Sequence, residues 1–286
     1  MLKVKRNERL CVYARGVLSA LVIAGMLGCH GDVLAPKLED LVEPGKLAYE
    51  SHDLSAGALH RRMEEIDDLF AETRTYAKAL ASYELCLQSI SSVNQYGALW
   101  RGARAASWIG MQRSVPHGLR QRFALNGISF GREAVKKDST SVESFYYLAF
   151  SLAALADSKR DASPKLLREI KARMAFAEAL DVTYDNCGPS RFLGQFFVKT
   201  EGYPFRYAMG TMDQGLAKLK AASEGCPEYA ENHLAYARAL VEDEQYEEAR
   251  LELEKVLASV TPQDRSTEHH EWLLAAQELL TETHGK

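Results

Sequence analysis

The sequence lacks the motifs that mark most enzyme classes. Its 286 residues include no glycine-rich phosphate loop, no His-Glu-x-x-His motif, and no serine or cysteine in a recognisable nucleophile motif. The run Glu-His-His-Glu at 268–271 supplies no metal site, because adjacent helical histidines point about 100° apart and rarely chelate one ion. The sequence therefore predicts a protein that is not an enzyme, with no catalytic residues, no cofactor and no metal.

The apolar run near the start of the chain is too short to cross a membrane. Gly16–Gly28 has 13 residues, whereas a spanning helix needs about 20. Because basic residues precede this run, residues 1–28 are predicted to be an export signal. The sequence Met-Leu-Gly-Cys at 26–29 resembles a lipobox, in which the cysteine is lipidated and becomes the new N-terminus. Cys29 is thus the predicted lipidation site, and a lipid anchor the only membrane contact; the alternative is an ordinary cleaved signal.

The rest of the chain lacks an excess of positive charge. The predicted export signal holds five basic residues and one acidic residue, so the totals of 35 and 39 fall to 30 and 38 without it, a net charge of −8. Nucleic acids and anionic bilayers attract basic proteins, so this balance argues against both as partners. Small molecules and other proteins remain as the classes of partner.

Cysteine is scarce, with five in the whole chain. Cys86 lies in an apolar helical pattern and is predicted to be a small buried core residue. Cys187 and Cys226 lie in the turn-like sequences Asn-Cys-Gly and Gly-Cys-Pro. Export to an oxidising compartment makes these two candidates for a disulfide, the alternative being two half-buried thiols.

Alternating strand patterns are absent, and from Leu59 onward the apolar residues recur at helical spacing. The sequence predicts an all-α chain. Residues 29–57 contain helix-breaking prolines and are expected to form a tether, while residues 58–286 are expected to form one helical domain.

The helical domain repeats one pattern, like that of a tetratricopeptide (TPR) repeat. Such a repeat places a small residue where two helices touch and a large one where a groove must be filled. The frame returns five times, which predicts a solenoid of about five helix pairs, and residues 267–281 are expected to form a C-terminal capping helix. Asp67 and Arg104 fit poorly at small positions of the first helices. The small positions of the second helices are Ala79, Gly127, Ala172, Gly215 and Ala249.

The spacing between these small positions shows where the chain departs from the repeat. Nearly all the extra length falls inside the second, third and fourth pairs, in the loops or longer helices that join their two arms. Because these joints emerge along one edge of a solenoid, the sequence predicts a wall or rim at that edge.

Three segments narrow the resemblance beyond TPR proteins in general. They are Ala-Leu-Trp-Arg-Gly-Ala-Arg-Ala at 98–105, Phe-Tyr-Tyr-Leu-Ala at 145–149, and Gly-Pro-Ser-Arg-Phe-Leu-Gly at 188–194, followed by Gly-Tyr-Pro at 202–204. Together they resemble the TPR-containing T component of TRAP transporters, over about residues 77–257. The resemblance implies a periplasmic lipoprotein that works with a soluble solute-binding P component, which hands its ligand to a membrane permease.

The repeat register also names the residues expected to face a concave groove. They suit an amphipathic ligand or peptide, with apolar walls and an arginine fork for a carboxylate. The alternative is that the arginines pair with local acids such as Glu143 and lock neighbouring helices, and that the aromatic side chains belong to the core. The predicted ligand- or partner-binding residues are Arg101, Trp108, Tyr146, Phe150, Arg191, Gln195 and Arg238, with Tyr203 and Phe205 helping to wall the groove.

These observations predict a lipid-anchored periplasmic protein that docks a solute-binding protein and holds or passes on a hydrophobic or carboxylate-bearing ligand. His30 after the lipidated cysteine favours the outer membrane of a Gram-negative bacterium. The alternative function is a structural scaffold or pilot lipoprotein for an envelope assembly machine, with a groove for an extended peptide or helix. The oligomeric state stays open, a homo-oligomer included.

Overall fold

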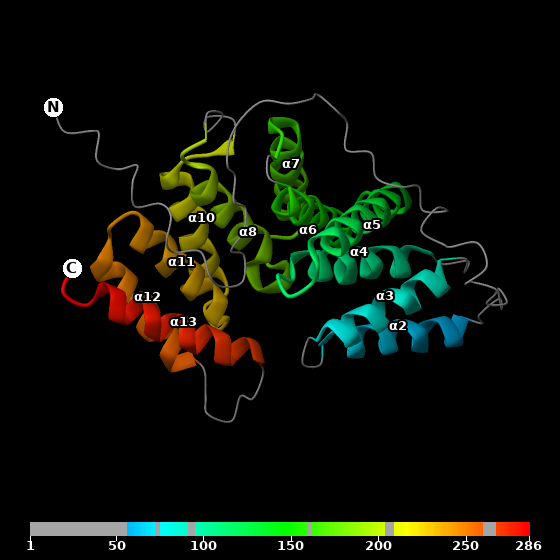
Figure 1. Cartoon of the computed structure of the whole chain (residues 1–286), viewed down its shortest axis with the longest axis horizontal. Helices are drawn as coiled ribbons and strands as arrows, with labels where there is room; N and C mark the ends of the chain where they lie inside the picture. Colours follow the sequence, from blue (N-terminus) through cyan, green and yellow to red (C-terminus); the bar gives the residue numbers. More distant parts are fainter. Residues whose placement is uncertain (1–55, 72–74, 91–94, 160–161, 204–208, 260–266) are drawn as a thin grey trace.

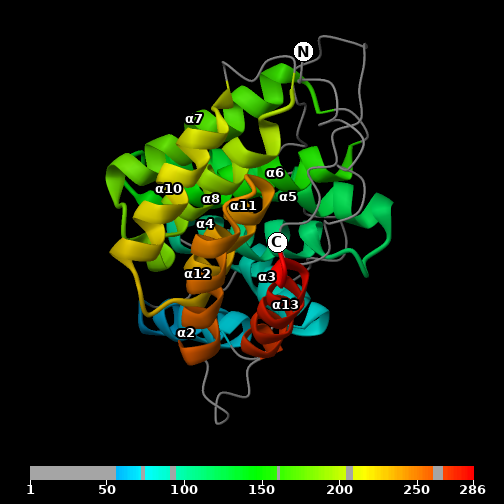
Figure 2. The same cartoon turned by 90° about the vertical axis from the view of Figure 1, so that its left-hand side faces the viewer.

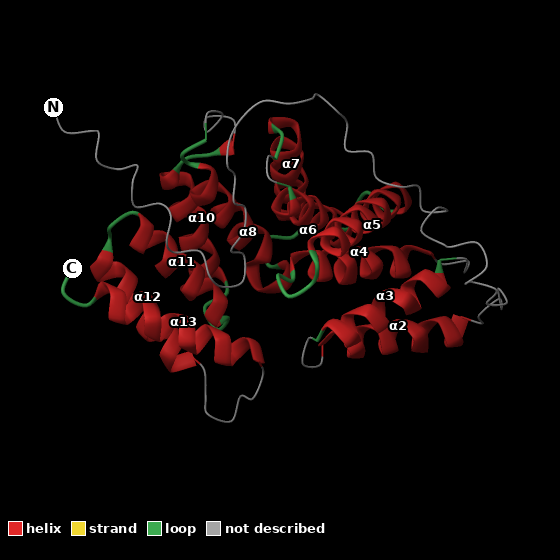
Figure 3. Ribbon diagram, in the orientation of Figure 1, coloured by secondary structure: helices red, strands yellow, loops and turns green. Residues whose placement is uncertain are grey.

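The computed structural model of the chain describes residues 56–71, 75–90, 95–159, 162–203, 209–259 and 267–286. The predicted export signal, Cys29 and nearly all of the predicted tether lie outside the described residues. Within these ranges the chain forms eleven α-helices and no strand (Figure 3). The all-α prediction is confirmed.

The helices follow one another in five consecutive pairs and a last single helix. The first member of each pair packs against the second, and α13 packs against α12 and α11. Figure 1 shows them along a curved path, from α2 and α3 at one end to α12 and α13 at the other, and α12 and α13 run side by side in Figures 1 and 2. The pairs are α2 (Ala56–Ala71) and α3 (Tyr76–Ser89), α4 (Gln95–Met111) and α5 (His117–Lys137), α6 (Val142–Ser158) and α7 (Pro164–Leu180), α8 (Tyr184–Thr200) and α10 (Met212–Gly225), and α11 (Ala230–Glu242) and α12 (Tyr246–Ser259), followed by α13 (Thr267–Thr283).

Several helices begin where side chains satisfy the free N–H groups of a first turn. Thr75 accepts a hydrogen bond from the backbone N–H of Lys78 at the start of α3. Ser163 immediately precedes Pro164, the first residue of α7, and accepts a hydrogen bond from the backbone N–H of Leu166. At α10, Thr211 forms a full capping box with Gln214. Local sequence thus fixes the starts of these helices.

Small residues let two helices approach closely in the fourth pair. A Cβ atom on Gly194 would lie 2.9 Å from the carbonyl oxygen of Gly215, and one on Gly215 would lie 3.0 Å from that of Gly194. Real Cβ atoms hardly ever come so close, so both positions need glycine. Ala79 and Ala249, the small positions of the first and last pairs, are buried. These packing positions were predicted from the register.

The register prediction is wrong for α7. Ala172 was expected at a helix contact, but its side chain is exposed. Its neighbour two residues on, Met174, is fully buried instead, because the apolar face of α7 lies on the other side of the helix. That face consists of Leu166, Leu167, Ile170, Met174 and Ala177.

The extra length inside the second and third pairs lies mostly in longer helices. α4, α6 and α7 have 17 residues each and α5 has 21, whereas α11 has 13 and α12 has 14. The far ends of these helices contact one another: His117 lies 2.5 Å from the carbonyl oxygen of Ser158, and Arg120 pairs with Asp157. The joints of the second and third pairs therefore contact each other, whereas the joint of the fourth pair, also part of the predicted rim, lies partly outside the described residues.

Cys86 lies in the core between the first helices. Its side chain has no exposed area, and burial raises the pKa of its thiol to about 12. The prediction of a small buried core residue is confirmed, and a thiol with a raised pKa is a poor nucleophile at neutral pH.

Candidate functional site

Arg101 on α4 is held by a carboxylate on α2. Its Nε and Nη2 donate to the two carboxylate oxygens of Asp67, at 2.8 and 2.6 Å, and its guanidinium lies 4.1 Å from the ring centre of Trp100. Burial acts to raise the pKa of Asp67, but hydrogen bonds and charge from Arg101 and Arg104 outweigh it and hold that pKa below its usual value. This geometry agrees with the alternative prediction, in which the arginines pair with nearby acids and hold neighbouring helices together. The acid is Asp67 rather than Glu143.

The chain enters α8 through a left-handed turn. Asp185, Asn186 and Cys187 have φ angles of 50°, 54° and 61°, in the region that non-glycine residues rarely adopt. The right-handed part of α8 begins at Gly188. Cys187 is bonded to Cys226, with Cα atoms 5.9 Å apart, which fixes the end of this turn.

Arg191 is buried beneath this turn. Its guanidinium donates to the carbonyl oxygen of Asn186 and to Oδ1 of Asn232, and it lies 3.6 Å from carboxylate oxygens of Asp185 and Glu231. Only 6% of the residue is exposed. Burial by itself lowers the pKa of Arg191, but the negative charge of Glu231 and other acidic groups outweighs it and raises that pKa. Arg191 is engaged on every side, so its geometry supports a structural role.

The predicted aromatic residues of α6 divide between core and surface. Tyr146 is 1% exposed and its hydroxyl donates to Oδ2 of Asp185 at 2.5 Å, so it also supports the left-handed turn. Phe150 is half-buried, with its ring 4.9 Å from that of Phe192 on α8. Trp108 on α4 is half-buried against the apolar core formed mainly by α3, α4 and α5. Tyr203 is half-buried against the apolar core formed mainly by α6, α7 and α8. Phe205 lies outside the described residues.

Gln195 and Arg238 occupy a different environment from the other predicted polar residues. Both are half-buried, on α8 and α11 respectively, and these two helices contact each other. Lys199 lies one turn after Gln195, and Glu242 lies one turn after Arg238, so each pair shares one helix face. We call these four residues, Gln195, Lys199, Arg238 and Glu242, the inner strip.

The charged groups of the inner strip are partly desolvated. Burial lowers the pKa of Lys199 to about 8, with Glu242 opposing and Arg238 adding to that shift. Burial likewise lowers the pKa of Arg238 and raises that of Glu242. By surface area, however, Lys199 and Arg238 keep intermediate exposure and Glu242 is exposed. These charged side chains are therefore partly desolvated and still reach water.

Two atoms at or near the inner strip are buried without a hydrogen-bond partner in the described part of the chain. They are Oε1 of Gln195 and Oδ1 of Asp157, whose other carboxylate oxygen pairs with Arg120. Asp157 lies close enough to Lys199 to influence its pKa. Arg238, for its part, makes no hydrogen bond or ion pair with any described residue; its charged neighbours are Glu231 and Glu278. The strip thus contains a cation and a buried acceptor that no described residue pairs with.

Lys199 and Glu242 were not among the predicted site residues. The register could have found them, because the thirteenth position of a first helix also faces the groove, and these two residues occupy it. Asp157 lies beyond the length of an ordinary repeat helix, on the extended end of α6. No signal in the repeat pattern points to it.

Two open surface hollows lie over α10, α11 and α12, and neither includes a residue of the inner strip. One is lined in part by His233 and Glu252, whose side chains are 2.6 Å apart. The described residues contain no group of three or more His, Cys, Asp or Glu placed to hold a metal ion. Among the described helices, none combines the length and apolar character needed to span a membrane.

Comparison with models of known protein families gives no match for this chain. A search of curated proteins also finds no matching sequence.

Proposed function

We propose that this chain is a non-enzymatic, TPR-like binding protein, the T component of a TRAP-type transport system. In this role it docks a soluble solute-binding protein and holds or passes on a hydrophobic or carboxylate-bearing ligand. The proposal combines the resemblance of the 188–194 segment with the arrangement of the helices.

The packing of the helices supports a TPR-like solenoid. Five helix pairs follow one another, and first helices of neighbouring pairs contact each other, α4 with α6 and α8 with α11. The close approach at Gly194 and Gly215 occurs at the small positions that a helical repeat requires. A solenoid of this kind presents an extended concave surface, which is what such proteins use for binding.

The observation that carries the binding role is the state of Arg238. A guanidinium that burial desolvates is normally paired with a carboxylate, because an unpaired buried charge is costly. Arg238 is half-buried and makes no hydrogen bond or ion pair with a described residue, although Glu231 and Glu278 lie near enough to act on its pKa against the effect of burial. A ligand carboxylate would supply the missing partner in a two-point hydrogen-bonded geometry.

The proposed location is the periplasm, with a lipid anchor at Cys29 in the outer membrane. The Cys187–Cys226 bond supports an oxidising compartment, because disulfides persist there and are rare in the cytosol. The anchor itself rests on the sequence pattern at 26–29.

The test is co-purification from membranes. The full chain is expressed with an affinity tag in a Gram-negative host that also carries its neighbouring genes, extracted in mild detergent and analysed by native mass spectrometry. We expect a periplasmic solute-binding protein to be recovered with the chain, and Cys29→Ser to release the complex from the membrane fraction. Recovery of neither a solute-binding protein nor a bound small molecule contradicts the proposal.

The same experiment separates the alternative function. A structural scaffold or pilot lipoprotein would instead bring down components of an envelope assembly machine, with an extended segment of one of them protected by the groove. Neighbouring genes for a permease and a solute-binding protein favour transport, and genes for secretion or outer-membrane assembly favour a scaffold.

A further inference from the structure

Helix α7 has a second apolar face, which no helix in the described part of the chain covers. Its members lie at positions i, i+3, i+4, i+7 and i+8, so they share one side of the helix. All of them are exposed, Phe176 by 56% and Leu180 by 39%. We call this set the α7 patch; it consists of Ala172, Ala175, Phe176, Ala179 and Leu180.

The two charged side chains in this half of α7 have partners within the chain. Glu178 accepts a hydrogen bond from the hydroxyl of Ser190 on α8 at 2.6 Å and pairs with Lys218 on α10 at 2.5 Å. Nη2 of Arg173 lies 3.9 Å from Oε1 of Glu169, one turn earlier on the same helix. The C-terminal half of α7 is therefore apolar on two sides, a pattern typical of a helix that is covered on both.

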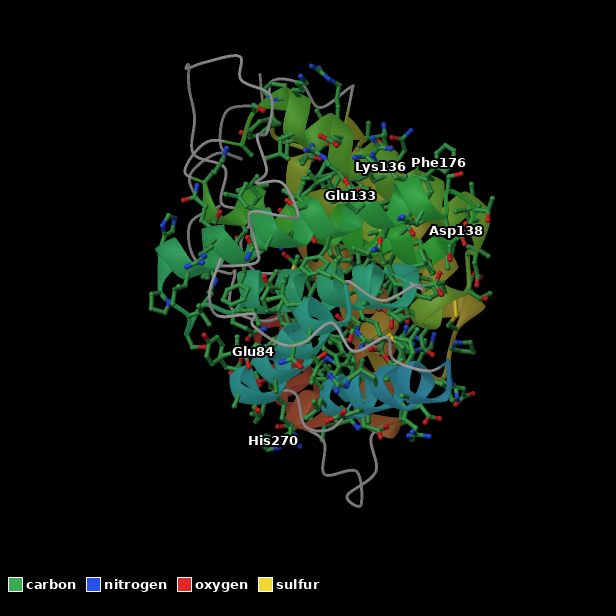
Figure 4. All side chains as sticks on the ribbon, turned by 90° about the vertical axis from the view of Figure 1, so that its right-hand side faces the viewer. Glu84, Glu133, Lys136, Asp138, Phe176 and His270 are labelled. Atoms are coloured by element: carbon green, nitrogen blue, oxygen red, sulfur yellow. A yellow bond between two sulfur atoms is a disulfide. The ribbon has the colours of Figure 1, made fainter. Side chains whose placement is uncertain are left out.

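Phe176 is the largest side chain of the patch and is held in place. Its ring stacks on that of Phe145 on α6, with ring centres 4.8 Å apart, and Phe145 is 4% exposed. Figure 4 shows Phe176 at the surface of the protein. An aromatic ring that is already fixed loses little conformational freedom on binding, and such rings are frequent anchors of protein interfaces.

The charges of α7 are sorted along its length. The N-terminal half has four basic residues and one acidic residue, whereas the C-terminal end has two acidic residues and no basic one. They are Lys165, Arg168, Glu169, Lys171 and Arg173, followed by Glu178 and Asp181. Two copies of this helix packed antiparallel would oppose unlike charges, and two packed parallel would oppose like charges. The surface of α7 is thus complementary to a second copy of itself, related by a two-fold axis.

An antiparallel pairing centred on Phe176 brings Arg168 and Asp181 together. They lie eight residues before and five residues after Phe176, about 12 and 8 Å along the helix axis. Arg168 is exposed, and Asp181 is half-buried, with Oδ1 accepting from the backbone N–H and the hydroxyl of Thr183. Because an arginine side chain is long enough to span the difference, Arg168 of each copy can reach Asp181 of the other.

We propose that the α7 patch is a two-fold interface between two copies of this chain. In this dimer α7 packs antiparallel to α7 of the second copy, with Phe176 near the axis and an ion pair between Arg168 and Asp181 at each end. The contact is one helix face with its flanks, at the small end of specific interfaces, so we expect a dissociation constant in the micromolar range. The inference goes beyond the proposed transport function and does not depend on it.

The association is measured on the full chain by sedimentation equilibrium in density-matched detergent, at about 1 to 100 µM. We expect a monomer–dimer equilibrium for the unaltered chain. Phe176→Glu puts a charge at the centre of the interface and should raise the dissociation constant about tenfold or more. Leu251→Glu is the matched control: Leu251 is 60% exposed on α12, outside the patch, and its replacement should leave the equilibrium unchanged.

An exchange of charges tests the antiparallel arrangement. Arg168→Glu and Asp181→Arg should each weaken the dimer about threefold or more, because each places like charges opposite one another, and the double variant should recover the affinity. Circular dichroism and thermal melting establish that each variant is folded.

Cross-linking locates the axis independently of affinity. Ala175→Cys, beside Phe176, should form a disulfide between two copies under mild oxidation. Ala221→Cys, at an exposed position of α10, is the control and should not.

A chain that stays monomeric up to about 100 µM overturns the proposal, and so does a dimer that Phe176→Glu does not weaken. If the chain is a monomer and Phe176→Glu abolishes recovery of a solute-binding protein from membranes, the patch docks that protein and the assignment to a second copy is wrong. A dimer with the expected responses stands even where no solute-binding protein is recovered, so the dimer and the transport function fail separately.

Discussion

Asp67 on α2 and Arg104 on α4 form an ion pair, with 2.8 Å between Oδ1 and Nη2. They are the two residues that fit poorly at the small positions of the first and second pairs. Each is too large for its position, and the two bond to each other instead, while the guanidinium of Arg104 also lies 4.2 Å from the ring centre of Phe70. A charged contact thus replaces close packing between these two helices.

Removing the shared carboxylate should destabilise the first two pairs. Asp67→Ala leaves the guanidinium groups of Arg101 and Arg104 without their common acid. Because Asp67 is 37% exposed, solvent screens the interaction, and we expect a loss of about 1 kcal/mol in the free energy of unfolding. Urea denaturation measures it. Asp68→Ala, at the exposed neighbouring position, is the control and should change stability by less than about 0.5 kcal/mol. Equal losses in the two variants would mean that the Asp67 carboxylate does not stabilise the fold through Arg101 and Arg104.

Arg191 and Arg238 should behave in opposite ways when truncated. Arg191→Ala removes a buried guanidinium that four groups surround, and leaves the Glu231 carboxylate without its partner. We expect a loss of about 3 to 5 kcal/mol in the free energy of unfolding. Arg238→Ala removes no hydrogen bond to a described residue and should cost less than about 1 kcal/mol. Chemical denaturation of the two variants side by side decides the assignment, and a stable Arg191→Ala protein with lost binding would restore Arg191 as a groove residue.

Reduction of the Cys187–Cys226 bond should lower stability. The bond closes a loop over a sequence separation of 39 residues, and constraining a loop of that size in the unfolded chain is worth about 2 to 4 kcal/mol. Thermal melting with and without a dithiol reductant measures the loss. In the Cys187→Ser and Cys226→Ser double variant the reductant should have no effect, since the remaining described cysteine, Cys86, is a free thiol.

The pair formed by His233 and Glu252 should give the stability a dependence on pH. The hydrogen bond to Glu252 raises the pKa of His233, against the opposing effect of burial, and the other ring nitrogen lies 2.8 Å from the carbonyl oxygen of Pro227. A raised folded pKa contributes stability that is fully present below the unfolded value, about 6.5, and is lost as pH rises through the folded pKa.

The urea midpoint should therefore fall as pH rises above about 6.5, and His233→Gln should flatten this dependence. Below about pH 4.5, the ordinary pKa of a glutamate, a second loss is expected. Burial acts to raise the pKa of Glu252, but hydrogen bonds from His233 and Lys255 outweigh it and lower that pKa, so its contribution disappears as pH falls through the folded value. His270, which is exposed on α13 (Figure 4), supplies the control: His270→Gln should leave the pH profile unchanged.

A single methyl group at Gly194 should disrupt the fourth pair. Its Cβ would lie 2.5 Å from Cγ of Leu219 and 2.9 Å from the carbonyl oxygen of Gly215. Since backbone cannot yield as a flexible side chain can, Gly194→Ala should cost about 1 to 3 kcal/mol. At Gly118, in the first turn of α5, an added Cβ meets nothing within 4 Å. Gly118→Ala should be neutral or stabilising by up to about 1 kcal/mol, and differential scanning calorimetry compares the two.

The all-helical fold and much of its packing could be predicted from the sequence, because helical periodicity and small contact residues are local or repeated signals. Gly194, Gly215, Ala79 and Ala249 were found in this way. Ala172 was misplaced, since several alanines in α7 suit a small position and only tertiary contacts select between them. The partners of a long side chain are not encoded locally either.

Arg191 illustrates this limit. Its position in the register faces the groove, but a left-handed turn folds over it, and the turn depends on contacts with Tyr146, Asn232 and Cys226 from other parts of the chain. The environment of Lys199 is equally non-local, because Arg238 and Glu242, which influence its pKa, lie on α11, and Asp157 lies on α6.

The left-handed turn at 185–187 also constrains how this protein can diverge. Three successive residues there have positive φ, a conformation that costs most side chains about 1 to 2 kcal/mol each but is tolerated by Asp, Asn and Gly. Any homologue that keeps the turn should carry one of these three residues at the positions of Asp185 and Asn186, and a cysteine or glycine at the third. A β-branched residue at any of them would indicate that the homologue enters this helix by another route.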